Sequence, residues 1–268
     1  MELDIFQLDA FTDSVFCGNP AAVVPLDNWL DTSVLQNIAA ENNVSETAFI
    51  VREAGAYEIR WFTPTVEVPL CGHATLASSY VLFNFFDTQA NALRFQCDLG
   101  ELHVTRTADV MHMRFPRFDP RECEKPQGLE GALGCTVSAV YKTDEDPNLY
   151  ALVESEAVLA SLTPNFEQLR ALFTTQGVVV TAKGDAGHTR PVDFVSRYFA
   201  PAFGIPEDPV TGSIHCGLVP MWAAKLGKQT LKARQVSARV GDLNCELREN
   251  EVVISGQAKL YLRGKIYI

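Results

Sequence analysis

Two short blocks of sequence occur twice in this chain, in the same order and about half a chain apart. An Arg-aromatic-Phe-x-Pro block stands at 60–64 as RWFTP and again at 197–201 as RYFAP. A Glu-x-Pro-x-x-Gly block follows at 67–72 and again at 207–212, so the second copy has three extra residues between the blocks. An apolar run follows each pair. This self-similarity predicts an internal duplication and two similar lobes, although short blocks also match by chance.

Length, charge and cysteine usage restrict the function. The chain has 268 residues, enough for two domains of roughly 100–150 residues. The formal net charge is −11 and no basic cluster offsets it, which disfavours nucleic acid and anionic membranes as partners. No apolar stretch approaches the ~18 residues of a membrane span, and the acidic N-terminus is unlike a signal peptide. The seven cysteines form no C-x-x-C pair, so we expect reduced thiols in a cytoplasmic protein.

Hydrophobic periodicity and turn residues predict many short strands and few helices, a pattern of the α+β class. The helices are expected at 31–43, 72–86, 165–177 and 211–227. The second and fourth of these are apolar on nearly every side, as buried helices are.

The domain boundaries are predicted from composition. The segment 116–134 is rich in Pro, Gly and charge and is interpreted as a linker, and 157–162 as a short strand or connector. Residues 1–118 are therefore expected to form an N-terminal lobe, which the last strand at about 257–268 can complete, and residues 119–256 a C-terminal lobe.

The repeated glycine stands where each apolar helix is expected to begin. The first backbone N–H groups of a helix have no intrahelical acceptor and carry the positive end of the helix dipole. Gly72 and Gly212 would let a small anion approach these groups, so we expect a carboxylate to bind there without lysine or arginine. Either glycine taken alone is more simply a turn residue.

The side chains at the aligned positions differ, so the chemistry is not repeated with the scaffold. The aligned pairs are His73 with Ser213, Cys71 with Thr211, and Val68 with Asp208. A histidine beside a helix-terminal glycine is a candidate acid–base group. Asp208 precedes a proline, where a side chain that closes an Asx turn is the structural alternative.

Three motifs resemble those of the phenazine-biosynthesis isomerase family, the PhzF-like proteins: SETAF at 45–49, FTPTVEVPLCGHAT at 62–75 and FGIPEDPVTGS at 203–213. The resemblance runs from the first strand to the last hairpin, and GNP at 18–20 fits it. It implies a diaminopimelate epimerase-like fold: two pseudo-symmetric lobes, each a β-barrel-like sheet around a central helix, with the site between them. It also implies a homodimer without a metal or an organic cofactor.

The resemblance assigns roles residue by residue. The catalytic positions match Glu46, His73, Asp208 and Ser213, and the substrate-binding positions match Asn19, Gly72, Ala74, Thr211 and Gly212. It implies that Glu46 takes a proton from a carbon of a small unsaturated or cyclic carboxylic acid. Glu46, or a relay through His73 and Asp208, then returns the proton elsewhere, as general acid–base catalysis allows. Without the resemblance, Glu46 would be interpreted as a surface or capping carboxylate.

One stretch departs from the family pattern. Members commonly carry Arg-Gly-Gly near the C-terminus, whereas this chain has Val240 between Arg239 and Gly241. We expect the fold to be kept and the choice of substrate to be affected.

Other functions stay open beside this one. A racemase or epimerase of an amino acid would use one thiol from each lobe, but only Cys71 is in place and Thr211 is too weak an acid to be its partner unaided. A small-molecule binding protein would keep the pocket without proton exchange. A metal hydrolase is disfavoured, because the adjacent His215 and Cys216 do not face each other on a helix. The other histidines lie in different expected elements without ligand-like spacing: His103, His112 and His188.

Overall fold

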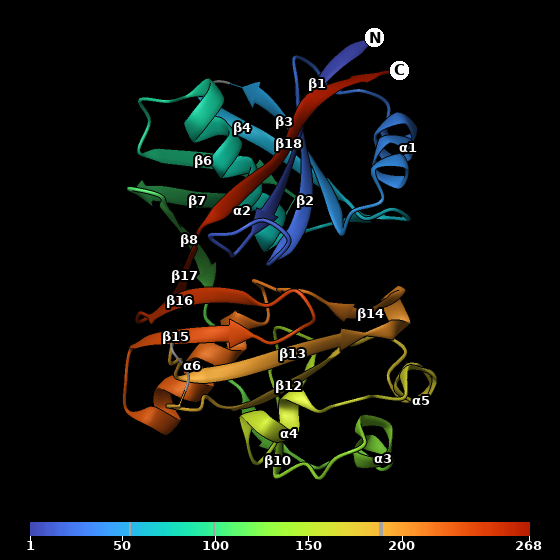
Figure 1. Ribbon diagram of the computed structural model, residues 1–268, viewed down its shortest axis with the longest axis vertical. Coiled ribbons are helices and arrows are strands. Elements are labelled where there is room, and N and C mark those ends of the chain that lie inside the picture. Colours follow the sequence, from blue (N-terminus) through green and yellow to red (C-terminus); the bar gives the residue numbers. More distant parts are fainter. Residues whose placement is uncertain (54, 99, 188–189) are drawn as a thin grey trace. The chain divides into compact units, whose positions relative to one another are not determined.

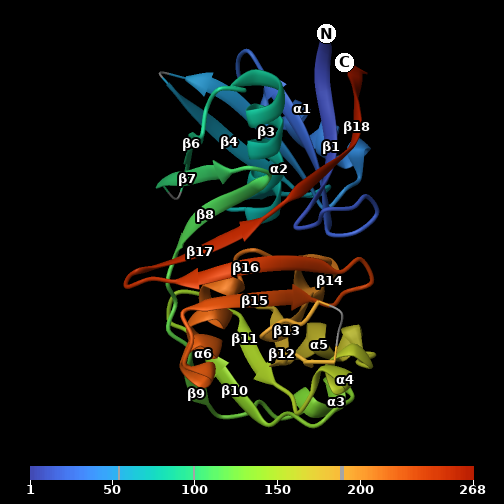
Figure 2. The same ribbon diagram turned by 60° about the vertical axis from the view of Figure 1, so that its left-hand side comes forward.

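The computed structural model describes residues 1–53, 55–98, 100–187 and 190–268 of the chain, which folds into two compact units. The first unit contains Met1–Phe115 with Ile254–Ile268, and the second contains Pro116–Val253. Each limit lies three residues from the boundaries expected at 118 and 257. Figures 1 and 2 show the order of the elements within each unit.

The first unit is a sheet with two helices. Its strands are β1 (Glu2–Ala10), β2 (Asn19–Leu26), β3 (Glu46–Glu53), β4 (Ala56–Phe62), β5 (Glu67–Val68), β6 (Ala92–Cys97), β7 (Gly100–Thr107), β8 (Val110–Pro116) and β18 (Ala258–Tyr267). Its helices are α1 (Thr32–Asn42) and α2 (Gly72–Val81), the latter continued by a π-helical turn, η1 (Leu82–Phe86). β1 pairs antiparallel with β2 and β18, so the two chain ends lie side by side (Figure 1).

Apolar side chains on both faces of β2 place one helix on each side of the sheet. Successive residues of a strand point to opposite faces. Ala22 and Val24 belong to a buried cluster with Leu35 and Ile38 of α1. The alternate residues of β2 are also buried, and α2 packs against β1, β2, β3 and β18. β2 and β3 run parallel with α1 between them in the sequence, which is a βαβ unit.

The buried helix expected at 72–86 is confirmed. α2 begins at Gly72, and all residues from 72 to 79 are buried. Its hydroxyl groups are satisfied within the helix, because Thr75 Oγ1 donates to the Cys71 carbonyl at 2.6 Å and Ser78 Oγ to the Ala74 carbonyl at 2.8 Å. A helix with polar residues can therefore be buried without leaving those groups unpaired.

The second unit carries helices on both faces of a mixed sheet. Its strands are β9 (Arg121–Cys123), β10 (Ala139–Lys142), β11 (Leu149–Leu152), β12 (Val178–Lys183), β13 (Phe194–Ala200), β14 (Ile205–Asp208), β15 (Thr230–Gln235), β16 (Gly241–Leu247) and the first residues of β17 (Glu251–Gly256). Its helices are α3 (Leu129–Leu133), α4 (Glu156–Ala160), α5 (Phe166–Leu172) and α6 (His215–Leu226), with a 3-10 turn, η2 (Pro201–Phe203). No helix formed by the described residues is long and apolar enough to cross a membrane.

Alternation along β12 and β13 separates the two faces of this sheet. Val180 and Val195 join the cluster that packs against α3, α4 and α5. Phe194 and Thr181 point to the opposite face, where Trp222 of α6 stacks on Phe194 with ring centroids 5.8 Å apart. Trp222 Nε1 donates to Thr181 Oγ1 at 2.9 Å. In Figure 2 α6 lies on one side of these strands and α3 to α5 on the other.

Two sequence interpretations of this region are wrong. The segment 116–134 is not a linker, because it forms β9 and α3, and Leu129 and Leu133 are fully buried. The segment 157–162 is largely helical, because α4 occupies most of it. Ser155 Oγ accepts a hydrogen bond from Val158 N–H at the start of α4 and so caps this helix.

The repeated blocks form the same local structure in each unit. Arg60 Nε and Nη2 donate to the two carboxylate oxygens of Glu67, both at 2.7 Å. Arg197 Nε and Nη2 donate to the two oxygens of Glu207 at 2.7 and 2.8 Å. Each guanidinium also lies over the Phe ring of its own block, at 5.2 Å from Phe62 and 5.0 Å from Phe199. A bidentate arginine–carboxylate pair thus links the two blocks in both copies.

The strand register agrees with the alignment of the blocks. Trp61 pairs with Val68 in the first unit, and Tyr198 pairs with Asp208 in the second. The three additional residues of the second copy lie between the blocks, after Pro201, the block residue at which η2 begins. These shared details support the internal duplication, which stays our proposal.

The departure at Val240 leads to a stability prediction. Val240 has φ 54°, the left-handed region that a β-branched residue avoids, and it is 38% exposed. Val240→Gly is expected to raise the free energy of unfolding by about 1 kcal/mol, because relief of left-handed strain outweighs the added freedom of the unfolded chain. Val240→Ala keeps the strain and is the control. Urea denaturation measures both, and an equal gain in the two variants would contradict the explanation.

Candidate active site

The first residues of three elements, β2, β3 and α2, lie together in the first unit. Asn19 is the first residue of β2, and Glu46 is the first residue of the parallel strand β3, where it pairs with Ala21. α2 begins at Gly72, and Cys71 is its N-cap residue. Residues from three separate parts of the sequence are thereby brought to one place around His73.

His73 is the centre of this cluster. Its Nε2 lies 2.9 Å from Glu46 Oε2, and its Nδ1 lies 3.2 Å from Asn19 Nδ2 and 3.5 Å from Cys71 Sγ. The side chain of His73 is 4% exposed and that of Glu46 12%. The ion pair is therefore largely removed from water, where charge interactions are stronger than at the surface.

Opposing effects act on the pKa of His73. Burial alone would lower it, but the charge of Cys71 where its thiol is ionised, the Glu46 carboxylate, and hydrogen bonds to both side chains hold it well above the usual value. Burial, followed by the Glu46 charge, raises the pKa of the Cys71 thiol. The thiol is therefore neutral near pH 7, and the Glu46 carboxylate is the charge that holds the His73 imidazolium there.

Asn19 can support either protonation state of His73. With Nδ2 toward Nδ1, the amide donates to a neutral ring whose Nε2–H donates to Glu46. With the amide turned, its oxygen accepts a hydrogen bond from Nδ1–H of the imidazolium. An amide that serves both states suits a group that takes up and releases a proton.

The raised pKa of His73 predicts a pH-dependent stability. The unfolded pKa is about 6.5 and the folded pKa is higher. The stabilisation is therefore complete below about pH 6.5 and is lost as pH rises through the folded pKa, by at most about 1.4 kcal/mol per pH unit. In Glu46→Gln only burial and Cys71 still act on the pKa of His73. The loss of stability with rising pH should therefore vanish or become a gain. Urea denaturation of both proteins between about pH 6 and pH 9 tests this, and equal slopes would contradict it.

The second unit holds the other predicted residues in a separate network. The Thr211 hydroxyl donates to Asp208 Oδ2. Gln235 Nε2 donates to the Asp208 carbonyl, and Thr211 N–H donates to Gln235 Oε1, both at 2.8 Å. Asp208 therefore accepts a local hydrogen bond from the Thr211 side chain, while the Asx turn, which a backbone N–H would close, stays a prediction. Ser213 is partly buried in the following turn.

The expected helix start at Gly212 is wrong. α6 begins at His215, and Gly212, Ser213 and Ile214 form a tighter turn before it. In that turn His215 N–H donates to the Gly212 carbonyl and Cys216 N–H to the Ser213 carbonyl, both at 3.0 Å. The aligned glycines thus stand at different points relative to their helices: Gly72 lies in the first turn of α2, whereas Gly212 precedes α6.

Two polar residues of these networks were not among the predicted site residues. Cys71 contacts His73 from the N-cap of α2, and its Cys-x-His spacing was the signal available. Gln235 is fully buried at the end of β15 and organises Asp208 and Thr211, and no sequence pattern indicated it.

The remaining histidines are not acid–base candidates on this geometry. Burial lowers the pKa of His215 to about 4, and its neutral ring donates from Nδ1 to the Thr211 carbonyl at 2.8 Å. His103 pairs with Glu101 at the surface, and His112 contacts Ser255 Oγ at 2.8 Å. His188 lies outside the described residues.

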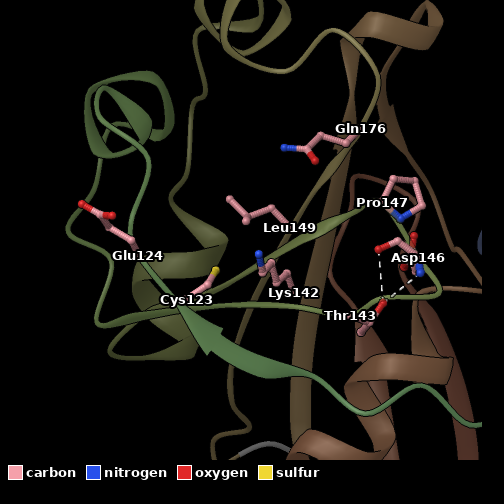
Figure 3. A pocket seen from close by; sticks show the side chains of 8 residues that line it. All are labelled: Cys123, Glu124, Lys142, Thr143, Asp146, Pro147, Leu149 and Gln176. Carbon is pink, nitrogen blue, oxygen red and sulfur yellow. Dashed lines mark hydrogen bonds between the residues drawn. The ribbon is translucent and has the colours of Figure 1, made fainter.

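A cavity of about 430 Å³ lies in the second unit, and none of the predicted site residues belongs to its lining (Figure 3). The carboxylate of Asp146, one of the lining residues, already accepts hydrogen bonds from Asn148 and Tyr150. Asp146 N–H donates to Thr143 Oγ1 at 2.9 Å. The cavity therefore has suitable size for a ligand but no paired acid and base. Its lining consists of Cys123, Glu124, Lys142, Thr143, Asp146, Pro147, Leu149 and Gln176.

Comparison with known proteins assigns the chain to a class and then to a family. In fold, it matches a crystal structure of a hydroxyproline epimerase from Agrobacterium vitis with a TM-score of 0.64, over 99% of this chain and 92% of that one. The identity there is only 8%, so this likeness shows the fold alone. The α+β, epimerase-like fold is thereby confirmed.

Closer relatives identify the family. The model of the phenazine biosynthesis-like proteins matches residues 8–264. An uncharacterized isomerase of Pseudomonas aeruginosa is 51% identical over all of both chains, and a mouse phenazine biosynthesis-like domain-containing protein is 42% identical over 99% of each. A PhzF-family crystal structure from Enterococcus faecalis matches with a TM-score of 0.94 and 45% identity over all of both chains. The chain belongs to the PhzF family of phenazine biosynthesis-like proteins and is an isomerase of that family.

Proposed function

We propose that this protein is a cofactor-independent isomerase that moves a proton on a small unsaturated or cyclic carboxylic acid, with Glu46 as the acid–base group. The observation that carries the proposal is the buried contact between Glu46 Oε2 and His73 Nε2 at 2.9 Å, at the start of α2. A carboxylate beside a histidine of raised pKa can accept a proton while the imidazolium balances its charge.

The start of α2 supports binding of an acidic substrate. The first N–H groups of this helix have no acceptor within the helix, and they carry the positive end of its dipole. Gly72, His73 and Ala74 form this first turn. A substrate carboxylate bound there would lie beside Glu46, and its negative charge would be met without a lysine or arginine.

Residues of the second unit complete the proposal. Asp208 and Ser213 are retained as catalytic residues, and Thr211 and Gly212 as substrate-binding residues, because the family motif assigns them. Hydrogen bonds from Thr211 and Gln235 fix the Asp208 segment, which is the positioning a catalytic carboxylate needs. A homodimer and a cytoplasmic location stay predictions from the sequence.

Solvent deuterium wash-in tests the proposal. The protein is incubated in deuterated buffer with a panel of small conjugated, cyclic and saturated carboxylic acids, and each acid is examined by NMR and mass spectrometry. We expect deuterium at a carbon of an unsaturated or cyclic acid, together with a shifted double bond. Binding of an acid without exchange would favour the non-catalytic binding protein.

The position of Cys71 favours one second candidate, an epimerase that uses this thiol as a base. Cys71 Sγ lies 3.5 Å from His73 Nδ1, within reach of a proton acceptor. Two features weigh against it: burial raises the pKa of the thiol, and the aligned Thr211 hydroxyl donates to Asp208. Inversion of a chiral amino acid that depends on Cys71 and not on Glu46 would establish the epimerase.

A further inference from the structure

Three different metal-ligand types converge at the start of α2. A thiol from Cys71, an imidazole from His73 and a carboxylate from Glu46 each offer one atom, and these atoms all lie within 4.8 Å of one another. Glu46 comes from β3, so only the fold brings it to the Cys-x-His pair. The sequence predicted no metal ligands here, because spacing along the chain does not reveal the third residue.

Two of the three ligand distances lie within about half an ångström of those around a tetrahedral ion. Zinc bonds of about 2.3 Å to sulfur and about 2.0 Å to nitrogen or oxygen place tetrahedral N and O ligands about 3.3 Å apart and N and S ligands about 3.5 Å apart. His73 Nε2 lies 2.9 Å from Glu46 Oε2 and 4.0 Å from Cys71 Sγ. The N–O pair must open by about 0.4 Å and the N–S pair must close by about 0.5 Å. The Cys71 thiol must also turn from Nδ1, which is 3.5 Å away, toward Nε2 before one ion can bind both groups.

The donor set selects the kind of metal. Thiolate and imidazole favour zinc and cobalt over magnesium and calcium, which prefer oxygen ligands. Three protein ligands leave one tetrahedral position open. Asn19 stands at the other ring nitrogen of His73, 3.2 Å away, where its amide oxygen would accept Nδ1–H and fix the ring.

We propose that Glu46, Cys71 and His73 form a binding site for Zn²⁺ that competes with proton transfer. Binding would replace the Glu46–His73 contact, the Cys71 thiol proton and the His73 Nε2 proton by three bonds to the metal, and both protons would pass to solvent. The ion would occupy the Glu46 carboxylate that the proposed function uses as its acid–base group, so it would act as an inhibitor. The inhibition, but not the binding, rests on the proposed function.

Cobalt titration of the metal-free, full-length protein tests the site directly. Co²⁺ is expected to give a thiolate-to-cobalt charge-transfer band and the intense visible bands of a tetrahedral ion, at one equivalent per chain, and Zn²⁺ should displace it. Cys71→Ser should lose the charge-transfer band and bind about 100-fold more weakly or worse. The control is Cys97→Ser, which removes a thiol that donates a hydrogen bond to the Gly100 carbonyl on another hairpin. This variant should leave the charge-transfer band and the affinity unchanged. Absence of the band in the wild type, or its survival in Cys71→Ser, would overturn the site.

The activity measurement separates this proposal from the proposed function. One equivalent of Zn²⁺ should abolish deuterium exchange in the wild type, and a chelator should restore it. If the cobalt bands appear and exchange continues with the metal bound, the metal site stands and the role of Glu46 fails. If exchange depends on Glu46 but no cobalt band forms, the metal site fails and the proposed function stands.

Discussion

Glu46→Gln is expected to reduce proton exchange on the substrate by about 10³-fold while the protein stays folded. General acid–base groups contribute between about 10² and 10⁴ in rate, and a 10³-fold loss corresponds to about 4 kcal/mol in the barrier. The amide has nearly the shape of the carboxylate and can still accept a hydrogen bond from His73 Nε2. It cannot take up a proton near pH 7, so the loss would report on acid–base chemistry rather than on packing.

The control for this variant lies on the same strand. Glu53→Gln makes the same chemical change at the other end of β3, where the side chain is exposed. It should leave the exchange rate within about twofold of the wild type, because a surface carboxylate contributes little. Exchange rates are measured with the acid that the wild type labels, and thermal melts confirm that each variant folds.

Two outcomes would change the mechanism. Exchange that survives in Glu46→Gln and disappears in Cys71→Ser would identify the thiol as the base and favour the epimerase. Loss in both variants would indicate that Glu46 and Cys71 act through the shared His73, which each contacts. The pH dependence of stability then distinguishes the role of Glu46, because only the Glu46 variant should lose the decline above about pH 6.5.

The sequence predicted the elements that present the site better than it predicted their pairing. The run after Gly72 is apolar on nearly every side, and its expected burial as a helix is confirmed. Periodicity reports how residues alternate along one element, not which element lies beside it. The parallel pairing of β2 with β3, which places Asn19 and Glu46 beside His73, was therefore not predicted, although a strand, helix and strand in succession are the pattern of a βαβ unit.

The repeat predicted a shared scaffold and could not predict where its copies diverge. Both copies join their blocks by a bidentate arginine–glutamate pair. α2 begins at the shared glycine itself, whereas in the second copy the glycine and the two residues after it form a turn before α6. The deciding contacts, such as those of the buried Gln235 with Thr211 and Asp208, come from a strand far along the sequence. Local sequence rules do not include such contacts.

Gly18→Ala is expected to lower the free energy of unfolding by about 3 kcal/mol, which is large for a change of one methyl group. Gly18 has φ 67°, where an L-residue costs about 1–2 kcal/mol. An added Cβ would also lie 2.1 Å from the Ala10 carbonyl oxygen and 2.8 Å from Thr12 Cγ2. Because the first of these atoms belongs to the backbone of β1, the collision can be relieved only by moving the hairpin.

The control separates the collision from the left-handed conformation. Gly55 also has a positive φ, 84°, but an added Cβ there meets no atom within 4 Å. Gly55→Ala, in the same unit, should therefore cost about 1 kcal/mol. Urea denaturation of both variants gives the difference, and equal losses would show that the contact with Ala10 does not constrain the turn.

Displacement of the turn that contains Gly18 should also alter the geometry of the candidate site. Asn19 follows Gly18 directly, pairs with Ala10 in the β1–β2 ladder and lies 3.2 Å from His73 Nδ1. Moving the Asn19 amide by an ångström would break that contact, so Gly18→Ala should reduce deuterium exchange by about tenfold even where the protein is fully folded. Gly55→Ala should not change it. A Gly18→Ala protein that is destabilised but exchanges at the wild-type rate would show that Asn19 does not orient His73, and the Gly-Asn-Pro turn would then serve the fold alone.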